Sequence, residues 1–297
     1  MSELNKIIIS QSTQSGMALG LCLSAFIELF LNIRSKYVWT RLLPLTIAAF
    51  FHTILNIGYL DVAYGNFDPI TGGTWILGVT IFRTIYYLID AFIYIERIRA
   101  FFSIWNKTYM NICIGYMITK FILQAIFDLW SGGLYIQLTT LEDSENFLTH
   151  NQIFLGTNYL SVLLPAIQAL LVDVPILWII VTNIKRLNKQ IEIDNRRLVR
   201  IGVLILSSIT VTIISIASSF KDLKLPIVSS ICIILVMSNL VNIDLYNLDI
   251  QLIKNSSSPH ATSQTSAKRS NVTSQISAQP RPSITKELME EPESPAV

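Results

Sequence analysis

The sequence predicts an all-α membrane protein, a seven-transmembrane helix bundle with its N-terminus outside and its C-terminus in the cytoplasm. The prediction rests on composition, on seven long apolar segments and on the distribution of Lys and Arg. Of the 297 residues, 52% are hydrophobic and 14% are charged, and the mean hydropathy is +0.51. Soluble domains carry roughly 25% charged residues, so the composition excludes an ordinary soluble enzyme and a disordered protein. The net charge of +2 is too small for a nucleic-acid-binding face.

Seven apolar segments are long enough to cross a bilayer, which takes about 20 helical residues. They cover 13–33, 42–60, 74–95, 108–130, 157–182, 201–219 and 225–247. A polar turn around Lys221 and Asp222 separates the last two. The chain therefore divides into a short extracellular N-terminus over 1–12, a seven-helix transmembrane domain over 13–254, and a cytoplasmic tail over 255–297. We expect this tail to be disordered, because it is rich in Ser, Thr and Pro and poor in apolar residues.

The Lys and Arg residues fall on alternate loops, which predicts the orientation. Seventeen of them lie in 34–41, 96–107, 183–200 and the segment after the last span, whereas three lie on the opposite side. Cytoplasmic loops carry the excess of Lys and Arg in membrane proteins. We therefore place the N-terminus outside and the C-terminus in the cytoplasm, in an integral membrane protein of the lipid bilayer with the plasma membrane as its default location.

The third span carries a long polar stripe. Its members recur at spacings of four, three, four and three residues, which keeps them on one helical face; they are Arg83, Tyr87, Asp90, Tyr94 and Arg97. Ionisable groups at membrane depth cost on the order of 2.5–3.5 kcal/mol each and usually face the bundle interior. The stripe therefore predicts a central helix that lipid does not touch. It is explained either by a network that holds helices together or by a binding site.

The fourth span repeats this pattern with Lys120, Gln124 and Asp128. At roughly 1.5 Å per residue, Arg83 lies about 14 Å and Lys120 about 15 Å below the outer surface. Asp128 is shallower and Asp90 is deeper, so neither is expected to be a direct partner. Two cations in one layer need counter-charges or an anionic ligand. We therefore predict an outer-half pocket for a small ligand, formed by Arg83, Tyr86, Tyr87, Lys120 and Gln124.

A deeper layer is acidic. Asp90 and Asp173 each lie roughly 24 Å below the outer surface. Such a pair could share a proton or hold a cation; alternatively, each pairs with a separate Ser, Asn or Tyr. Pro175 frees a backbone carbonyl and is expected to kink the fifth span. The full set of predicted intramembrane network residues is His52, Asp90, Tyr94, Asp128 and Asp173.

Two short motifs at span ends add to the evidence from the seven-span topology. Glu96-Arg97-Ile98 ends the third span, and Asn242-Ile-Asp-Leu-Tyr246 ends the seventh. With seven spans and basic inner loops, the chain resembles the G-protein-coupled receptors, and it is similar to a divergent or orphan fungal member. Ile98 replaces the family's aromatic residue, and Ile243 replaces its proline. The resemblance implies that the arginine closes the cytoplasmic gate and meets a heterotrimeric G protein. The implied effector-coupling residues are Glu96, Arg97, Arg99, Asn242 and Tyr246.

Together these features favour a receptor-like protein that senses a small ligand and signals through basic cytoplasmic loops. The alternative is a seven-span transporter or channel that uses Asp90 and Asp173. We do not expect an enzyme, a metal site or a cofactor, because the sequence has no metal-ligand cluster and no nucleophile paired with a base. Ser270 and Ser283 follow basic residues and are predicted phosphorylation sites, unless the tail is an unregulated solvated segment. The sequon at Asn106 is expected to stay unglycosylated, because it lies on the cytoplasmic side.

Overall fold

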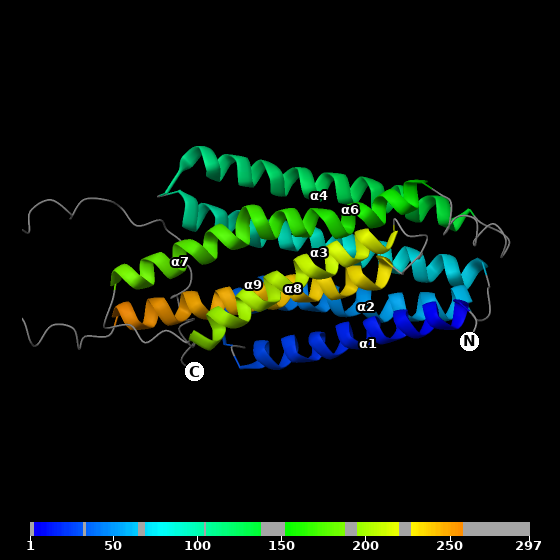
Figure 1. Cartoon of the computed structure of the whole chain (residues 1–297), viewed down its shortest axis with the longest axis horizontal. Helices are drawn as coiled ribbons and strands as arrows, with labels where there is room; N and C mark the ends of the chain where they lie inside the picture. Colours follow the sequence, from blue (N-terminus) through cyan, green and yellow to red (C-terminus); the bar gives the residue numbers. More distant parts are fainter. Residues whose placement is uncertain are drawn as a thin grey trace, which may run out of the picture.

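The computed structural model describes residues 3–31, 34–64, 69–103, 105–137, 152–187, 195–219 and 227–257. Within these ranges the chain is helical apart from short turns, and no strand occurs. The helices run along one common axis and form a single bundle (Figure 1). The predicted phosphorylation sites Ser270 and Ser283 lie outside the described residues.

The described residues form ten helical elements. They are α1 (Glu3–Phe30), the π-helical turn η1 (Val38–Leu42), α2 (Leu43–Tyr64), α3 (Pro69–Phe102), α4 (Lys107–Ile136), α6 (Gln152–Gln168), the π-helical turn η2 (Ala169–Asp173), α7 (Val174–Leu187), α8 (Asn195–Ser219) and α9 (Ile227–Ser257). The first helix begins ten residues before its predicted span, and the last continues into the segment predicted as tail. Hydropathy marks only the apolar part of a helix, so it misses turns that continue beyond the apolar core.

Among the described residues, seven helical segments are long and apolar enough to cross a membrane. They are Thr13–Phe30, Val38–Gly58, Gly73–Phe102, Lys107–Ile136, Leu155–Thr182, Arg196–Ala217 and Ser230–Leu248. They confirm the predicted seven-span all-α class and indicate an integral membrane protein. The fifth span comprises α6, η2 and α7. The structural ends of the third and fourth spans lie seven and six residues beyond the predicted ends at 95 and 130.

The fifth span contains two prolines, and hydroxyl groups of neighbouring helices bond to the carbonyls that these prolines free. Proline has no N–H, so the carbonyl four residues earlier loses its helical donor. Pro175 leaves the Leu171 carbonyl without a donor, and Tyr109 Oη donates to that carbonyl at 2.6 Å. Pro165 leaves the Ser161 carbonyl open, and Tyr87 Oη donates to it at 3.5 Å. Hydroxyl groups of α3 and α4 therefore replace the lost helical bonds and fix the fifth span against both helices.

The centre of the bundle is α9, not α3. Of the seventh span, 89% is buried, against 50% of the third. Figure 1 shows α4 at one edge of the bundle and α1 at the other, with α3, α8 and α9 between them. One face of α3 is exposed and apolar, including Ile81, Leu88 and Phe92. The expectation that lipid does not touch α3 is therefore wrong: the polar stripe faces inward, and a full apolar stripe on the opposite face is left for lipid.

Exposed tryptophans lie near both ends of the bundle. We call the end at which α1 and α3 finish the basic end, because the Lys and Arg of 34–41 and 97–107 lie there. Trp39, Trp105 and Trp178 are exposed toward the basic end, and Trp130 toward the opposite end. Tryptophan is enriched where a membrane meets water. The three tryptophans toward the basic end are placed as expected for a membrane–water interface.

Candidate functional site

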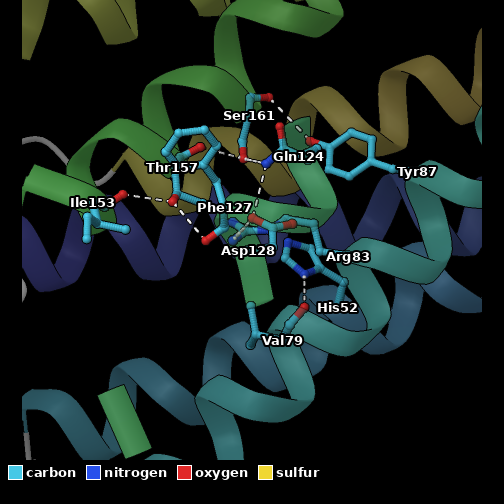
Figure 2. A network of polar contacts seen from close by, with 10 residues as sticks. All are labelled: His52, Val79, Arg83, Tyr87, Gln124, Phe127, Asp128, Ile153, Thr157 and Ser161. Carbon is cyan, nitrogen blue, oxygen red and sulfur yellow. Dashed lines mark hydrogen bonds and ion pairs between the residues drawn. The ribbon is translucent and has the colours of Figure 1, made fainter. Parts of the chain in front are cut away.

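The half of the bundle away from the basic end contains a fully buried ion pair between α3 and α4. Arg83 Nε and Nη2 donate to the two carboxylate oxygens of Asp128 at 2.9 and 2.6 Å. The two side chains are 6% and 0% exposed. Gln124, one turn earlier on α4, donates a third N–H to Asp128 at 3.1 Å. Figure 2 shows the carboxylate enclosed by these donors. This bidentate geometry is the strong form of the Arg–carboxylate contact.

The pairing corrects the expectation that Asp128 lies too shallow to reach Arg83. The fourth span ends at Ile136 and the third begins at Gly73. Counted from these ends, Arg83 lies about 15 Å deep and Asp128 about 12 Å. Lys120 lies about 24 Å deep and Asp90 about 26 Å by the same count. Because the predicted fourth span ended six residues early, every residue of that span was assigned a depth about 9 Å too shallow. The two ion pairs were therefore not recognised from the sequence.

Neutral polar groups from α2 and α6 surround this pair. Gln124 Nε2 also donates to the Ser161 hydroxyl, and Ser161 in turn donates to the Thr157 carbonyl at 2.9 Å. His52 lies on the other side, with Nδ1 3.2 Å from the Val79 carbonyl oxygen (Figure 2). Its Nε2 atom has no hydrogen-bond partner in the part of the chain that the structure describes. The contacts join α2, α3, α4 and α6 at one level.

A second buried pair lies nearer to the basic end. Lys120 Nζ is 3.0 Å from Asp90 Oδ2, and the side chains are 3% and 1% exposed. Lys120 also donates to Gln168 Oε1 of α6, and its ammonium lies over the Tyr87 ring at 5.2 Å from the centroid. Asn242 of α9 donates to the other oxygen of Asp90 at 3.2 Å. Four helices therefore meet at this ammonium and carboxylate.

Arg97 continues the arrangement toward the basic end. Its guanidinium donates to the side-chain oxygen of Asn242 at 2.5 Å and to the Asn242 carbonyl at 3.2 Å. It also lies over the Tyr94 ring, 5.4 Å from the centroid. Asn242 thereby connects Arg97 with Asp90. We use the name polar chain for the continuous series of contacts through Arg83, Asp128, Gln124, Ser161, Tyr87, Lys120, Asp90, Asn242 and Arg97.

The basic end is held by a separate group of ion pairs, which we call the clasp. Arg200 and Arg197 of α8 contact Glu28 of α1 and Asp244 of α9. Both arginines are partly exposed, at 36% and 29% of their side-chain surface. The clasp ties the sixth span to the first and the seventh. No sequence pattern indicated it, because its members are far apart along the chain.

Other predicted coupling residues also lie at the basic end. Glu96 pairs with Arg41 at 2.8 Å, with both side chains about two-fifths exposed, at 42% and 39%. The Tyr246 hydroxyl contacts Ser35, and its ring stacks on Tyr37 at 4.9 Å. Arg99 is exposed. The five predicted coupling residues therefore occupy one end of the bundle, although only Arg97 and Asn242 belong to the polar chain.

The structure brings together most of the predicted ligand-binding residues but leaves them enclosed. Arg83, Tyr87, Lys120 and Gln124 join the polar chain, whereas Tyr86 turns toward α9 and donates to the Leu235 carbonyl at 2.7 Å. All five are at least 95% buried. Because the protein supplies a carboxylate for each cation, the charge balance does not require an anionic ligand. Ser161 and Gln168 were not foreseen: single polar residues in an apolar span give no periodic signal.

The acidic layer is not a carboxylate pair. Asp90 is occupied by Lys120 and Asn242. Asp173 lies at the end of η2 and lines a small cavity, and its Oδ1 atom lacks a hydrogen-bond partner among the described residues. The two aspartates therefore differ in kind: one is neutralised by a neighbouring helix and the other is not. Within the same described ranges, no three His, Cys, Asp or Glu gather to hold a metal ion.

No protein-family model, curated protein or solved structure matches this chain. The resemblance to the G-protein-coupled receptors therefore rests on the seven apolar helices and on the two motifs alone.

Proposed function

We propose that the protein is a receptor-like membrane protein that senses a small extracellular ligand and signals at its basic, cytoplasmic end to an effector such as a heterotrimeric G protein. The observation that carries the proposal is the buried Arg97, held by the neutral Asn242 of α9 at the end of the polar chain. Because Asn242 carries no charge, the Arg97–Asn242 contact can be released without leaving a buried carboxylate unpaired. The orientation follows from the distribution of Lys and Arg.

The relative strength of the contacts supports opening at the basic end. Breaking a buried ion pair costs about 3–5 kcal/mol, and two such pairs hold the middle of the bundle. A hydrogen bond to a charged group contributes about 1.5–3 kcal/mol, which is the class of the Arg97–Asn242 contact. The clasp is stronger than a surface ion pair, because its Asp244 is 0% exposed. The Arg97–Asn242 contact is therefore weaker than either buried ion pair, and it lies at the end where an effector would bind.

The polar chain supports a route between the two ends. It follows α3 from Arg83 to Arg97, which is 14 residues or about 21 Å of helix. Lys120 contacts α3 and α6, and Asn242 contacts both Asp90 and Arg97 of α3, so a change at one of them alters several contacts together. A ligand that displaced Arg83 or Gln124 would act on Lys120 and Asp90 through Ser161 and Tyr87. Release of Arg97 and the clasp would free the end of α8, of whose span 28% is buried.

The alternative function is a transporter or channel that uses Asp90 and Asp173. The ion pair of Asp90 with Lys120 disfavours it, because a carboxylate that carries an ion must be released from its counter-charge in each cycle. The unpartnered oxygen of Asp173 favours it.

The test compares Arg97→Ala with Lys107→Ala, an exposed lysine at the same end. The tagged full-length protein is solubilised gently from its native cells, and co-purification of a G-protein α subunit is measured with and without a non-hydrolysable GTP analogue. We expect a partner that the analogue releases, lost with Arg97→Ala and kept with Lys107→Ala at equal surface expression.

Flux into proteoliposomes is the counter-test. Receptor function predicts that Asp90→Asn and Asp173→Asn leave flux at the background of empty vesicles. Measurable flux through the wild type, lost in either variant while Arg97→Ala remains active, would overturn the proposal in favour of transport.

A further inference from the structure

A small cavity lies in the inner half of the bundle, where the fifth span changes from α6 through η2 to α7. Its volume is about 10 Å³, about the space that one water-sized species occupies. Its walls come from α6, η2, α8 and α9 and are mostly apolar. The polar residues that line it are Asp173, Ser208 and Ser238. A π-helical turn such as η2 interrupts the regular helical ladder and is frequent at functional sites.

Asp173 is a buried carboxyl group without a counter-charge in contact. The residue is 5% exposed, and Oδ1 has no hydrogen-bond partner among the described residues. The other three buried Asp residues among the described ones each contact a cation at 3.2 Å or less: Asp90 with Lys120, Asp128 with Arg83, and Asp244 with Arg200. A buried carboxylate is costly unless a positive charge or hydrogen bonds compensate it. Asp173 is the exception within the part of the chain that the structure describes.

The nearby cations are committed elsewhere. Arg97 faces Asp173 from α3 but donates to Asn242, and Lys120 of α4 contacts Asp90 and Gln168. The Tyr94 hydroxyl faces the Asp173 carboxyl. Tyr94 Oη is itself buried and lacks a partner in the described ranges. Asp173 therefore lines a space for one small species, and its Oδ1 atom has no hydrogen-bond partner among the described residues.

We propose that this cavity binds one small monovalent cation at Asp173. The donors around it are a carboxylate and hydroxyl groups, and such hard oxygen ligands select hard cations rather than transition metals. A single carboxylate balances a single positive charge. Na⁺ and a proton are two monovalent cations of this chemistry. The site stands independently of the proposed receptor function, and its test measures binding rather than signalling.

The experiment measures the thermal unfolding temperature Tm of the purified full-length protein by its tryptophan fluorescence. In the first arm, N-methylglucamine chloride is replaced by NaCl at constant ionic strength. In the second arm, pH varies from 5.5 to 8.5 without Na⁺. A ligand that binds only the folded state raises Tm. We expect a saturable rise of roughly 3–6 °C at about ten times the Na⁺ dissociation constant, or an equivalent rise on acidification if the cation is a proton.

Asp173→Asn is the decisive variant, because the amide keeps the shape of the carboxyl group and removes its charge. We expect the Tm of this variant not to respond to the cation, Na⁺ or proton, that raises the Tm of the wild type. Its Tm should equal or exceed that of the wild type without the cation. Ser208→Ala should raise the dissociation constant for Na⁺ about threefold to tenfold. Ser215→Ala on the same helix should not, because Ser215 bonds to the Val211 carbonyl and does not line the cavity.

Two results would overturn the proposal. One is a wild-type Tm that is constant in both arms. The other is an Asp173→Asn variant that keeps the full response, since the cation would then bind elsewhere. Neither result depends on whether a G protein co-purifies, so failure of this site and failure of the receptor function remain distinguishable.

Discussion

Arg83→Met tests whether the ion pair of α3 and α4 is a principal source of stability. The substitution keeps much of the side-chain volume and removes the two donors at 2.9 and 2.6 Å from Asp128. Asp128 would keep only the Gln124 donor, at 3.1 Å, in a position of 0% exposure. Removing one partner of a buried pair costs about 3–5 kcal/mol. At about 2–4 °C per kcal/mol, we expect Tm to fall by about 6–20 °C.

The double variant Arg83→Met/Asp128→Leu completes the measurement. Apolar replacement of a whole buried pair is often neutral or stabilising, so Tm should return to within about 5 °C of the wild type. Thermal unfolding in one detergent gives all the Tm values of the cycle, with the exposed Arg99→Met as a control expected to change stability by less than about 0.5 kcal/mol. Additive effects of the two single substitutions would refute the reasoning, because they would mean that each charge is stabilised without the other.

Two further predictions concern contacts at the basic end. Asn106 accepts the Tyr109 N–H at 3.0 Å and caps α4; Asn106→Ala should cost about 0.5–2 kcal/mol, and Asn106→Asp should retain stability, since a carboxylate is also a good cap. We expect Asn106 to carry no glycan, so neither substitution should change the electrophoretic mobility of the protein. A glycan on Asn106 would contradict the predicted orientation. Arg200→Gln removes contacts with Glu28 and with the fully buried Asp244. Because Arg197 still contacts both carboxylates, we expect a loss of about 1.5–3 kcal/mol in the same unfolding assay. A loss as large as that of Arg83→Met would show that the clasp stabilises the bundle as strongly as the buried pair in its middle.

The seven helices were predictable because each contains an apolar stretch long enough to cross a bilayer, and this property is local to the sequence. The inward faces were predictable for the same reason: spacings of three and four placed Arg83, Asp90 and Arg97 on one face of α3, and the structure keeps them there. Periodicity fixes the direction of a side chain around its helix. It does not fix the height of one helix against the next.

Contacts between helices were the part that the sequence could not supply. Apolar windows fixed the end of the fourth span six residues early, and that error alone separated Lys120 from Asp90. The clasp is harder still, because Glu28, Arg200 and Asp244 are separated by most of the chain. Such pairs follow from which helices are neighbours, and neighbourhood is a property of the packed bundle.

The two fully buried ion pairs have a consequence for biosynthesis. Both of them join α3 to α4, which follow one another in the chain. Alone in the bilayer, each helix would carry one unpaired cation and one unpaired anion at depth, at roughly 2.5–3.5 kcal/mol per charge. As a helical hairpin, the two segments neutralise one another. We therefore expect α3 to leave the translocon together with α4, after the ribosome has translated Ile136. The charged side chains would then enter the lipid as ion pairs and not as unpaired charges.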